Sequence, residues 1–372
     1  REGTKLKIIH TEASLGWGGQ EIRILSEASG IEKMGHEIEI WASPNSNIIR
    51  EATAMGLKIK PLPISEKRIS NIFKIRSEIK KSAPDIINTH SSTDTWLVAL
   101  ANTTIRNSPP LIRTRHISAP VPKNFASRWL YTHATTHIVT TGNALKKQLV
   151  EENGFPASNI TSIPTGIDIK RFYPGDRFEA RKNLGISEDN KYIGILATLR
   201  SWKGHLYLLD AFSKLDIPEW RLLIIGDGPM RKPIEEKIKQ LNINDRVLMV
   251  GQQKNPEEWL RALDIFCLPS YANEGVPQAI IQAMLSEIAI ISTPIGAINE
   301  IITDGHSGLL VTPRNSKQLA YAIKKLSQDI ALMTKLSATA RTYAFDRLQL
   351  ERMINKMEAL FYQSAGIRKI QK

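Results

Sequence analysis

Short apolar runs alternate with segments of helical periodicity along almost the whole chain, and this alternation constrains the fold more than any other feature. Repeated strand and helix units of this length favour a parallel sheet that is covered by helices on both faces. The first half is therefore predicted to form a Rossmann-like α/β domain. Its predicted strands are residues 5–11, 38–41, 59–62, 86–90, 111–116 and 138–141.

The alternation is interrupted once, at residues 162–174, where the segment SIPTGIDIKRFYP contains several turn-forming residues. Such a segment is typical of a connection between domains. The chain has 372 residues, enough for two domains that each bury a core. The second domain is predicted to contain strands at residues 192–199, 221–225, 247–250, 265–269, 289–293 and 308–311.

The composition is that of an ordinary soluble globular protein, with 42% hydrophobic and 23% charged residues. No apolar run approaches the roughly 18 residues that a membrane span needs, and the first residues lack the apolar core of a signal peptide. The single cysteine, Cys267, lies inside an apolar run. We expect it to be a packed core thiol in a reducing, cytoplasmic compartment, without disulfides or cysteine metal sites.

Basic residues are concentrated in the first half of the chain. The formal net charge is +13, and residues 58–147 hold 15 Lys and Arg against 4 Asp and Glu. This excess favours an anionic partner, namely lipid headgroups, a phosphorylated acceptor or nucleic acid, although a solvated basic face has the same composition. No RNA-binding aromatic motif or basic recognition helix is present, so nucleic acid is not expected.

One predicted helix, at residues 69–81, lies in this basic window. Its apolar residues Ile69, Ile72, Phe73 and Ile79 are expected roughly on one side, with the basic residues elsewhere. The pattern fits an ordinary packed helix, and it also fits a helix that touches anionic lipid.

The stretch from Asp264 to Glu300 contains the strongest functional signal. An apolar run ends at Pro269, and a loop then places Glu274 at the carboxyl end of the predicted strand. Gly275 and Pro277 follow and predict a helix start, so Glu274 is expected beside a helix N-terminus. In open α/β sheets this edge binds ligands, and free backbone amides there favour phosphate.

This stretch resembles the signature of retaining nucleotide-sugar glycosyltransferases of family 4. That signature contains an acid, seven further residues and a second acid, followed by a later Gly-x-x-Glu. Here Glu274 and Glu300 match its first and last acids, whereas Gln282 occupies the position of the second acid. An amide still hydrogen-bonds a ribose diol, so Gln282 is expected to alter nucleotide affinity without abolishing catalysis.

Two other segments extend the resemblance over nearly the whole chain. The loop with Gly18 and Gly19 is similar to the family's Gly-Gly-x-Glu, and residues 164–168 match its hinge segment Pro-x-Gly-x-Asp. The resemblance implies a GT-B fold, in which two Rossmann-like domains face each other across a cleft. It further implies an acceptor-binding domain at residues 1–172, a donor-binding domain at residues 173–347, and a last helix, about 348–372, that packs back on the first domain.

The resemblance also implies the donor site. Lys203 matches the family's Lys-Gly and would carry the charge of the departing diphosphate, as electrostatic catalysis without a metal requires. Thr198 stands where the family has an arginine, and Arg200 lies two residues later. Loop glycines Gly226 and Gly228 are equally typical of a tight turn. The full set of expected donor residues is Gly18, Gly19, Thr198, Arg200, Lys203, Gly226, Gly228, Gly275, Val276 and Gln282.

Histidines mark the expected acceptor side. His116 ends a predicted strand where the family commonly has a histidine near the sugar, and we expect it to act in catalysis with Glu274 and Lys203. His90 ends the preceding strand, and Arg113 and Arg115 flank His116 as candidate acceptor-binding residues. No metal-ligand spacing is present among His133, His137, His205 and His306, so neither a metal site nor a cofactor is expected.

Together with these features, the resemblance implies transfer of a sugar, with retention of configuration, from a UDP-sugar or GDP-mannose. The expected acceptor is a glycan or lipid-linked saccharide of surface polysaccharide or lipopolysaccharide synthesis. The expected location is the cytoplasm, with peripheral contact at the inner face of the cytoplasmic membrane. Two alternatives are a GT-B nucleotide-sugar epimerase, for which Glu12 and Asp94 are the available acids, and a non-catalytic basic protein that binds membrane or nucleic acid.

Overall fold

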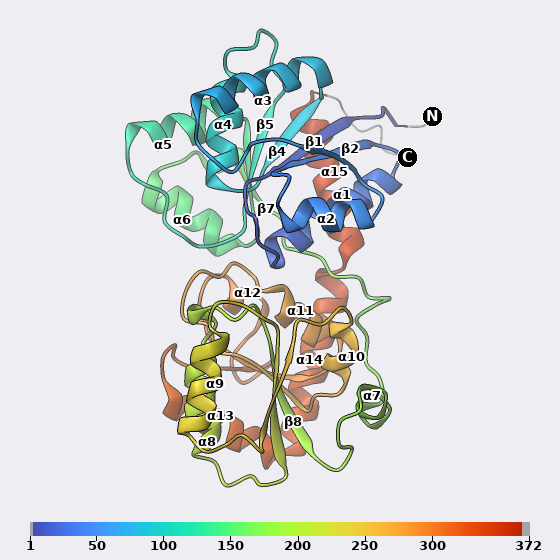
Figure 1. Ribbon diagram of the computed structural model, residues 1–372, viewed down its shortest axis with the longest axis vertical. Helices are drawn as coiled ribbons and strands as arrows, with labels where there is room; N and C mark the ends of the chain where they lie inside the picture. Colours follow the sequence, from blue (N-terminus) through green and yellow to red (C-terminus); the bar gives the residue numbers. More distant parts are fainter. Residues whose placement is uncertain (1–2, 367–372) are drawn as a thin grey trace. The chain divides into compact units, whose positions relative to one another are not determined.

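The computed structural model describes residues 3–366 and divides the chain into two compact α/β units (Figure 1). Unit 1 contains the residues up to Gly166 together with those from Leu350 onward, and unit 2 spans Ile167–Gln349. Each unit is built on one parallel sheet, which confirms the prediction of two Rossmann-like domains.

The sheet of unit 1 has seven strands in the order β3-β2-β1-β4-β5-β6-β7. Successive residues of a strand point to opposite faces, so Ile8 and Ile9 of β1 enter two separate apolar clusters. One cluster includes residues of α1, α2 and α15, and the other includes residues of α3, α4 and α6. The strands are β1 (Lys7–Glu12), β2 (Glu37–Ala42), β3 (Lys58–Pro61), β4 (Ile86–Thr89), β5 (Leu111–Arg115), β6 (His137–Thr140) and β7 (Ile160–Ser162).

The helices of unit 1 include one that arrives from the far end of the chain. This last helix, α15, buries Met353, Met357 and Phe361 against α1, and Glu358 on it lies 2.8 Å from Nε2 of His36. The helices are α1 (Gly19–Lys33), α2 (Asn47–Ala54), α3 (Ile69–Ser82), α4 (Ser92–Asn102), α5 (Phe125–Trp129), α6 (Asn143–Asn153) and α15 (Leu350–Ser364).

Unit 2 has a six-stranded sheet in the order β10-β9-β8-β11-β12-β13. Its strands are β8 (Lys191–Leu196), β9 (Trp220–Ile225), β10 (Val247–Gly251), β11 (Ile265–Leu268), β12 (Ala289–Ser292) and β13 (Leu309–Leu310). Its helices are α7 (Arg177–Leu184), α8 (His205–Ser213), α9 (Arg231–Gln240), α10 (Pro256–Arg261), α11 (Gln278–Leu285), α12 (Ile298–Ile301), α13 (Ser316–Ser327) and α14 (Ile330–Arg347).

A buried ionic cluster holds the amino end of β11 in unit 2. Asp264 accepts hydrogen bonds from the guanidinium groups of Arg181 at 2.6 Å and Arg177 at 3.1 Å, and from the backbone N–H of Tyr192 at 2.8 Å. Because Arg181 is almost fully buried, its charge depends on this partner.

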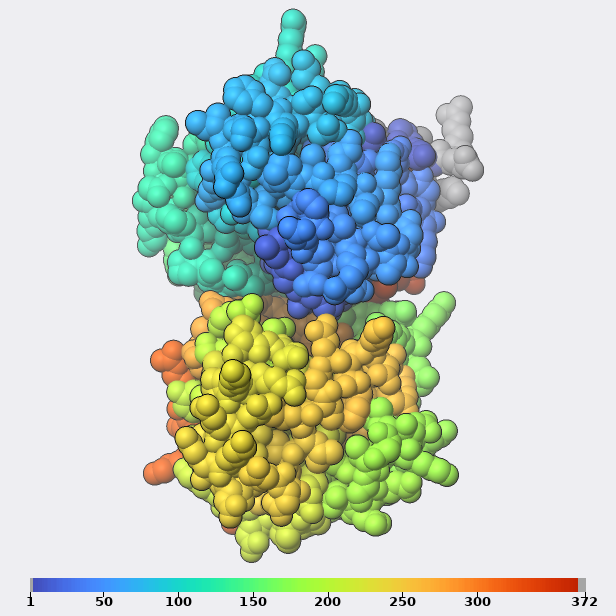
Figure 2. Space-filling view, viewed as in Figure 1, coloured from blue at the N-terminus to red at the C-terminus, as the bar shows by residue number. Residues whose placement is uncertain are grey.

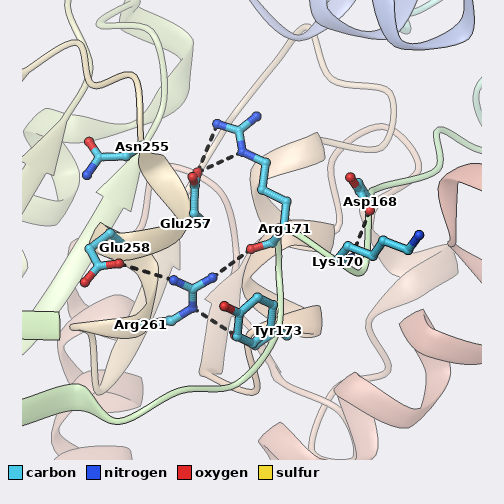
Figure 3. A pocket seen from close by; sticks show the side chains of 8 residues that line it. All are labelled: Asp168, Lys170, Arg171, Tyr173, Asn255, Glu257, Glu258 and Arg261. Carbon is cyan, nitrogen blue, oxygen red and sulfur yellow. Dashed lines mark hydrogen bonds and ion pairs between the residues drawn. The ribbon is translucent and has the colours of Figure 1, made fainter. Parts of the chain in front are cut away.

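The boundary between the units lies at Gly166 and Ile167, before the predicted position at residue 172. The N–H of Ile167 donates to the carbonyl of Leu348 at 2.9 Å, so this part of the connection already belongs to unit 2. Further along, Arg171 pairs with Glu257 of α10, and Arg261 donates to the carbonyl of Arg171 at 2.8 Å (Figure 3).

These contacts surround a polar pocket of about 320 Å³ between the connection and α10. The close-up in Figure 3 shows the Arg171–Glu257 and Arg261–Glu258 pairs among its lining side chains. None of the predicted site residues lines this pocket. Its two arginines, Arg171 and Arg261, are paired with neighbouring acids and carbonyls, so we interpret the pocket as the attachment of the connection to unit 2.

Two local predictions were wrong. The helix after Glu274 begins at Gln278, and Pro277 precedes it with a ψ of 128°, because the fixed φ of proline suits extended backbone as well as a first helical turn. In α3 the buried residues are Asn71, Ile75 and Ile79, whereas Ile69 and Phe73 are exposed.

Strand β7, at the edge of the unit 1 sheet, was not predicted, because its three residues are too few to show a periodicity. Helix α5 continues into a π-helical turn, Leu130–Ala134. Cys267 is fully buried in β11, as predicted. Among residues 3–366, no helix is long and apolar enough to cross a membrane.

Candidate active site

The strand order of unit 2 reverses between β8 and β11, which are neighbours in the sheet. Lys203 lies in a short 3₁₀ turn, Ser201–Lys203, after β8, and Glu274 lies in the loop after β11. Parallel strands end at the same edge, so the reversal brings these two loops together. The crevice at such a switch point is where open α/β sheets bind their ligands.

Lys203 and Glu274 are in direct contact. Glu274 is only 4% exposed, and its Oε1 accepts hydrogen bonds from Nζ of Lys203 at 2.5 Å and from Oγ of Ser270 at 2.8 Å. The free-energy cost of burying this carboxylate is therefore offset by its contacts with a cation and a hydroxyl. A lysine ammonium has three donors, so Lys203 can hold Glu274 and a phosphate oxygen at the same time.

The loop after β12 supports the loop that carries Glu274. Gly296 has a φ of +62°, and a Cβ at this position would lie 2.2 Å from the backbone oxygen of Glu274. The N–H of Ala297 donates to the carbonyl of Gly275 at 2.9 Å. The Pro-Ile-Gly turn thus places its backbone directly against Glu274, which only a glycine allows.

The loop after β9 packs in the same way against the loop after β8. Gly226 has a φ of +134°, and a Cβ there would lie 2.0 Å from the oxygen of Ala197. Backbone packing alone therefore requires this glycine. Donor contacts of Gly226, Gly228 and the neighbouring Thr198 stay predictions.

The remaining predicted donor residues of unit 2 differ in exposure. Arg200 is exposed, and its guanidinium lies 5.8 Å from the centre of the Trp202 ring. Val276 and Gln282 are buried, Gln282 within α11. The structure brings Glu274 and Lys203 together, whereas it leaves ligand contacts of Arg200, Gly275, Val276 and Gln282 as predictions.

Unit 1 reverses its strand order between β1 and β4. The glycine loop follows β1, and the N–H of Gly18 donates to Oε2 of Glu21 at 2.9 Å, while Gly19 is the first residue of α1. Gln20 donates to Glu12 at the end of β1 at 2.5 Å. These bonds fix the glycine loop beside the carboxyl ends of the central strands.

Three histidines form a continuous chain at this same switch point. Nδ1 of His10, in β1, lies 2.9 Å from Nε2 of His90, which follows β4. Nδ1 of His90 lies 3.0 Å from Nε2 of His116, which follows β5. His10 and His90 are buried and His116 is half-buried, so the chain runs from the core of unit 1 toward its surface.

The inner end of this chain is a buried carboxylate. Oε2 of Glu27, on α1, lies 3.6 Å from Nε2 of His10. Arg23, one turn earlier on α1, is also buried and donates to the carbonyl of Ile163 and to Oγ1 of Thr165. Both carboxylate oxygens of Glu27 and Nε2 of His10 lack a hydrogen-bond partner within residues 3–366.

Burial dominates the titration of all these groups. It lowers the pKa of His10 to about 3 and lowers the pKa values of His90 and His116 well below the ordinary value. Burial raises the pKa of Glu27 to about 7, and the charge of Arg23 opposes this rise. The three imidazoles are therefore neutral at physiological pH, and Glu27 titrates there.

Sequence reasoning found His90 and His116 but missed His10, Glu27 and Arg23. His10 sits inside a buried strand and Glu27 on the buried side of a helix, so neither stands at the end of an element where a site is expected. One signal in the sequence could have revealed His10. Residues of β1 alternate between the two faces of the sheet, so His10 lies on the same face as the core residue Ile8.

His10, Glu27 and His90 also form the single group of potential cation ligands found among residues 3–366, with atoms within 4.8 Å of one another. The 2.9 Å between the His10 and His90 nitrogens is a hydrogen-bond length. The neighbouring guanidinium of Arg23 would repel a cation. We therefore describe these residues as a hydrogen-bonded chain.

Other polar side chains near His116 have internal partners. Arg113 is buried and donates to the carbonyl of Thr114, and Arg115 donates to the hydroxyl of Tyr131 and to the carbonyl of Ala119. Their acceptor-binding role stays a prediction. Asp94 caps α4 by accepting from the N–H groups of His90 and Ser91, and burial raises its pKa to about 7.

Two family models match consecutive parts of the chain. Residues 17–171 match Glycosyltransferase Family 4, and residues 176–343 match Glycosyl transferases group 1. The two matches cover most of both units.

Individual relatives and solved structures are more distant. The N-acetyl-alpha-D-glucosaminyl L-malate synthase of Bacillus anthracis is 28% identical over 56% of this chain, and the chain spans about half of that relative, 54%. The UDP-Gal:alpha-D-GlcNAc-diphosphoundecaprenol alpha-1,3-galactosyltransferase of Escherichia coli is 24% identical over 79% of each chain.

Among solved structures, Anabaena Alr3699/HepE in complex with UDP-glucose superposes with a TM-score of 0.86 at 19% identity. The superposition covers 96% of this chain and 100% of the Anabaena chain. Together with the two parallel sheets and their switch points, this likeness shows the GT-B fold. Because the two family models together match residues 17–171 and 176–343, the chain belongs to the family 4 type of GT-B glycosyltransferases.

Proposed function

We propose that the chain is a retaining glycosyltransferase that uses a UDP-sugar, with GDP-mannose as the second donor class. The acceptor is a glycan or lipid-linked saccharide of surface polysaccharide or lipopolysaccharide synthesis. The observation that carries this proposal is the Lys203–Glu274 pair at the switch point of unit 2. The named donor and acceptor of the E. coli relative and the UDP-glucose complex of HepE support the substrate classes.

In the proposed reaction, Lys203 stabilises the negative charge of the departing diphosphate. The acceptor oxygen bonds to the anomeric carbon on the face from which the phosphate oxygen leaves, and that phosphate oxygen takes the hydroxyl proton. Configuration is thereby retained without an enzymic nucleophile. Because Lys203 supplies the positive charge, we propose that neither a metal nor another cofactor is required.

The remaining predicted residues complete the site in this proposal. Glu274 orients Lys203 and the donor, Gln282 binds the ribose, and the glycine loops approach the nucleotide. His116 contacts the reacting sugars, while His90, Arg113 and Arg115 shape the acceptor side.

The test is a donor panel applied to the purified chain. A nucleotide that binds only the folded state raises the melting temperature, and the binding donors are then assayed for transfer or slow hydrolysis. NMR of the product identifies the anomeric configuration, and a parallel assay with EDTA tests metal independence. Failure of every donor to bind or react refutes the enzyme proposal, whereas an inverted product refutes only retention.

An epimerase is not favoured. The acids available in unit 1 have structural partners, since Glu12 accepts from Gln20 and Asp94 caps α4. The comparisons give the epimerase no support.

We also propose that unit 1 touches anionic lipid through α3, within a cytoplasmic location at the inner face of the membrane. Ile69 is 75% exposed and Phe73 is 67% exposed, and the exposed cations Lys67 and Lys74 lie beside them. Figure 2 shows this part of unit 1, in light blue, on the molecular surface. Exposed apolar side chains beside cations fit a headgroup layer of negative charge.

Vesicle flotation tests the membrane contact. Vesicles with phosphatidylglycerol should retain the chain and neutral vesicles should not. Replacing Ile69 and Phe73 by serine should abolish retention, whereas Phe178→Ser, at a 60% exposed position of unit 2, should leave it unchanged. Equal retention of the α3 variant and the parent chain would contradict this proposal.

A further inference from the structure

Because the three imidazoles of the histidine chain in unit 1 are neutral, their hydrogens can be arranged in only two ways. Each neutral imidazole carries one hydrogen and one lone pair, on different nitrogens. At separations of 2.9 and 3.0 Å, each junction needs one hydrogen between its two nitrogens. The hydrogens of His10, His90 and His116 must therefore all point inward or all point outward.

The two orientations present different groups at the ends of the chain. If all hydrogens point inward, Nε2 of His10 donates toward Glu27, and Nδ1 of His116 carries a lone pair. If all point outward, Nε2 of His10 has the lone pair, and Nδ1 of His116 carries a hydrogen. A mixed arrangement sets two lone pairs or two hydrogens against each other and loses a buried hydrogen bond.

The protonation of Glu27 decides between these orientations. An ionised carboxylate accepts only, and therefore stabilises the inward orientation; a protonated carboxyl group donates and stabilises the outward one. Its Oε2 lies 3.6 Å from Nε2 of His10, about half an ångström beyond hydrogen-bond length. A small side-chain rotation closes this gap and gives partners to two of the unsatisfied buried atoms.

We propose that Glu27 is a positioning residue which, through His10 and His90, sets whether Nδ1 of His116 offers a lone pair or a hydrogen to the sugar bound there. This inference rests on the proposed function for the identity of the ligand. It concerns the role of His116 in holding a hydroxyl, and it leaves the transfer of the acceptor proton to the phosphate unchanged.

The switch conserves protons. Each transfer takes place between neighbouring groups from Glu27 to His116, and one proton is exchanged with solvent. When Glu27 ionises, its proton passes to Nε2 of His10, the Nδ1 hydrogen of His10 passes to Nε2 of His90, and that of His90 passes to Nε2 of His116. The Nδ1 hydrogen of His116 leaves to water. Each N–H bond that breaks is replaced by one that forms, and one proton is released.

Charged and titratable groups from several elements face this chain. Arg23 on α1 lies beside Glu27 and stabilises its ionised form, and Arg113 on β5 helps to keep His90 and His116 neutral. Arg115 at the end of β5 acts on His116 in the same direction. Helix α15 contributes the apolar ring of Phe361, which lies edge-on to His10 at 6.3 Å. Asp94 on α4 also has a pKa raised to about 7, but it accepts from the backbone N–H of His90 and so does not set the orientation of the imidazole hydrogens. The other charges are arginines, so within physiological pH the switch titrates at Glu27.

The direct test is ¹⁵N NMR of the histidine side chains in the full chain, without substrate. The nitrogen that carries hydrogen is distinguished from the bare nitrogen by its chemical shift. Between pH 5.5 and 8.5, the hydrogen of His116 should move from Nδ1 to Nε2 in the parent chain. In Glu27→Gln the His116 shifts should no longer change with pH.

Two further variants distinguish loss of the proton relay from a general disturbance of the fold. His10→Asn keeps a polar group at the position of Nδ1 but cannot pass a hydrogen from Glu27, so it should also abolish the pH response of His116. Glu358→Gln alters the other buried carboxylate–histidine pair of unit 1, whose atoms lie 2.8 Å apart, and should leave His116 unchanged. If Glu27→Gln does not fold, His10→Asn still tests the relay.

The kinetic counterpart is the pH profile of kcat/KM for the acceptor. It should change about tenfold with the titration of Glu27, the effect of one hydrogen bond gained or lost, and this limb should vanish in Glu27→Gln. The relay is refuted if the His116 shifts do not respond to pH in the parent chain, still respond in both relay variants, or change on addition of EDTA. A normal NMR response without transfer from any donor would refute the proposed function alone.

Discussion

Replacing Glu27 by glutamine should make the stability of the chain less sensitive to a rise in pH from mildly acidic to neutral values. Burial raises the pKa of this carboxyl group from 4.5 to about 7. A raised pKa stabilises the folded state fully below the unfolded value, and this contribution is lost as the pH rises through the folded value. The glutamine amide does not ionise and does not show this loss.

The magnitude follows from the two pKa values. At 1.36 kcal/mol per pKa unit, the complete effect is roughly 3 kcal/mol. Roughly 2 kcal/mol of it falls between pH 5.5 and 8.5. For a domain of this size, such a difference corresponds to roughly 4 to 8 °C in melting temperature.

The assay is urea denaturation of the parent chain and of Glu27→Gln at several pH values across this range. The difference in free energy of unfolding between the two chains should grow with pH in favour of the variant. Contributions of the histidines are nearly the same in both chains and cancel. Glu358→Gln serves as the control, and a parent-to-Glu27→Gln difference that stays constant from pH 5.5 to 8.5 would refute a raised pKa at Glu27.

Four other substitutions test the remaining parts of the structure. Glu274→Ala should lower kcat by about 10²- to 10³-fold, because Lys203 loses its buried partner, and unchanged turnover would contradict the assigned site. Gln282→Glu should leave kcat near that of the parent and change mainly the KM for the donor, as steady-state kinetics will show. Asp264→Asn should lower the free energy of unfolding of unit 2 by about 3 to 5 kcal/mol, measured by urea denaturation, because Arg181 loses a buried charge partner. Gly296→Ala should displace the backbone of Glu274 and lower kcat while the chain stays folded by circular dichroism, and full activity would show that the loop adapts.

The sequence carried much of the fold because each element has its own local signal. Apolar runs and helical periodicity located twelve of the thirteen strands that the structure describes within residues 3–366, whereas the three-residue β7 is too short for a periodicity. Prediction of the start of α11 failed because Pro277 fits both extended and helical backbone. The faces of α3 were misjudged because exposed Ile69 and Phe73 have the same hydrophobicity as buried side chains.

By itself, then, the sequence determined two parallel α/β units and identified Lys203, Glu274, His90 and His116 as separate candidates. Only the tertiary structure decided which of them meet. The order of strands places β8 beside β11 and β1 beside β4, and this order depends on long-range packing that no local pattern encodes. For the same reason, Glu27 on α1 and His10 inside β1 acquire significance only when the folded core brings them together behind His116.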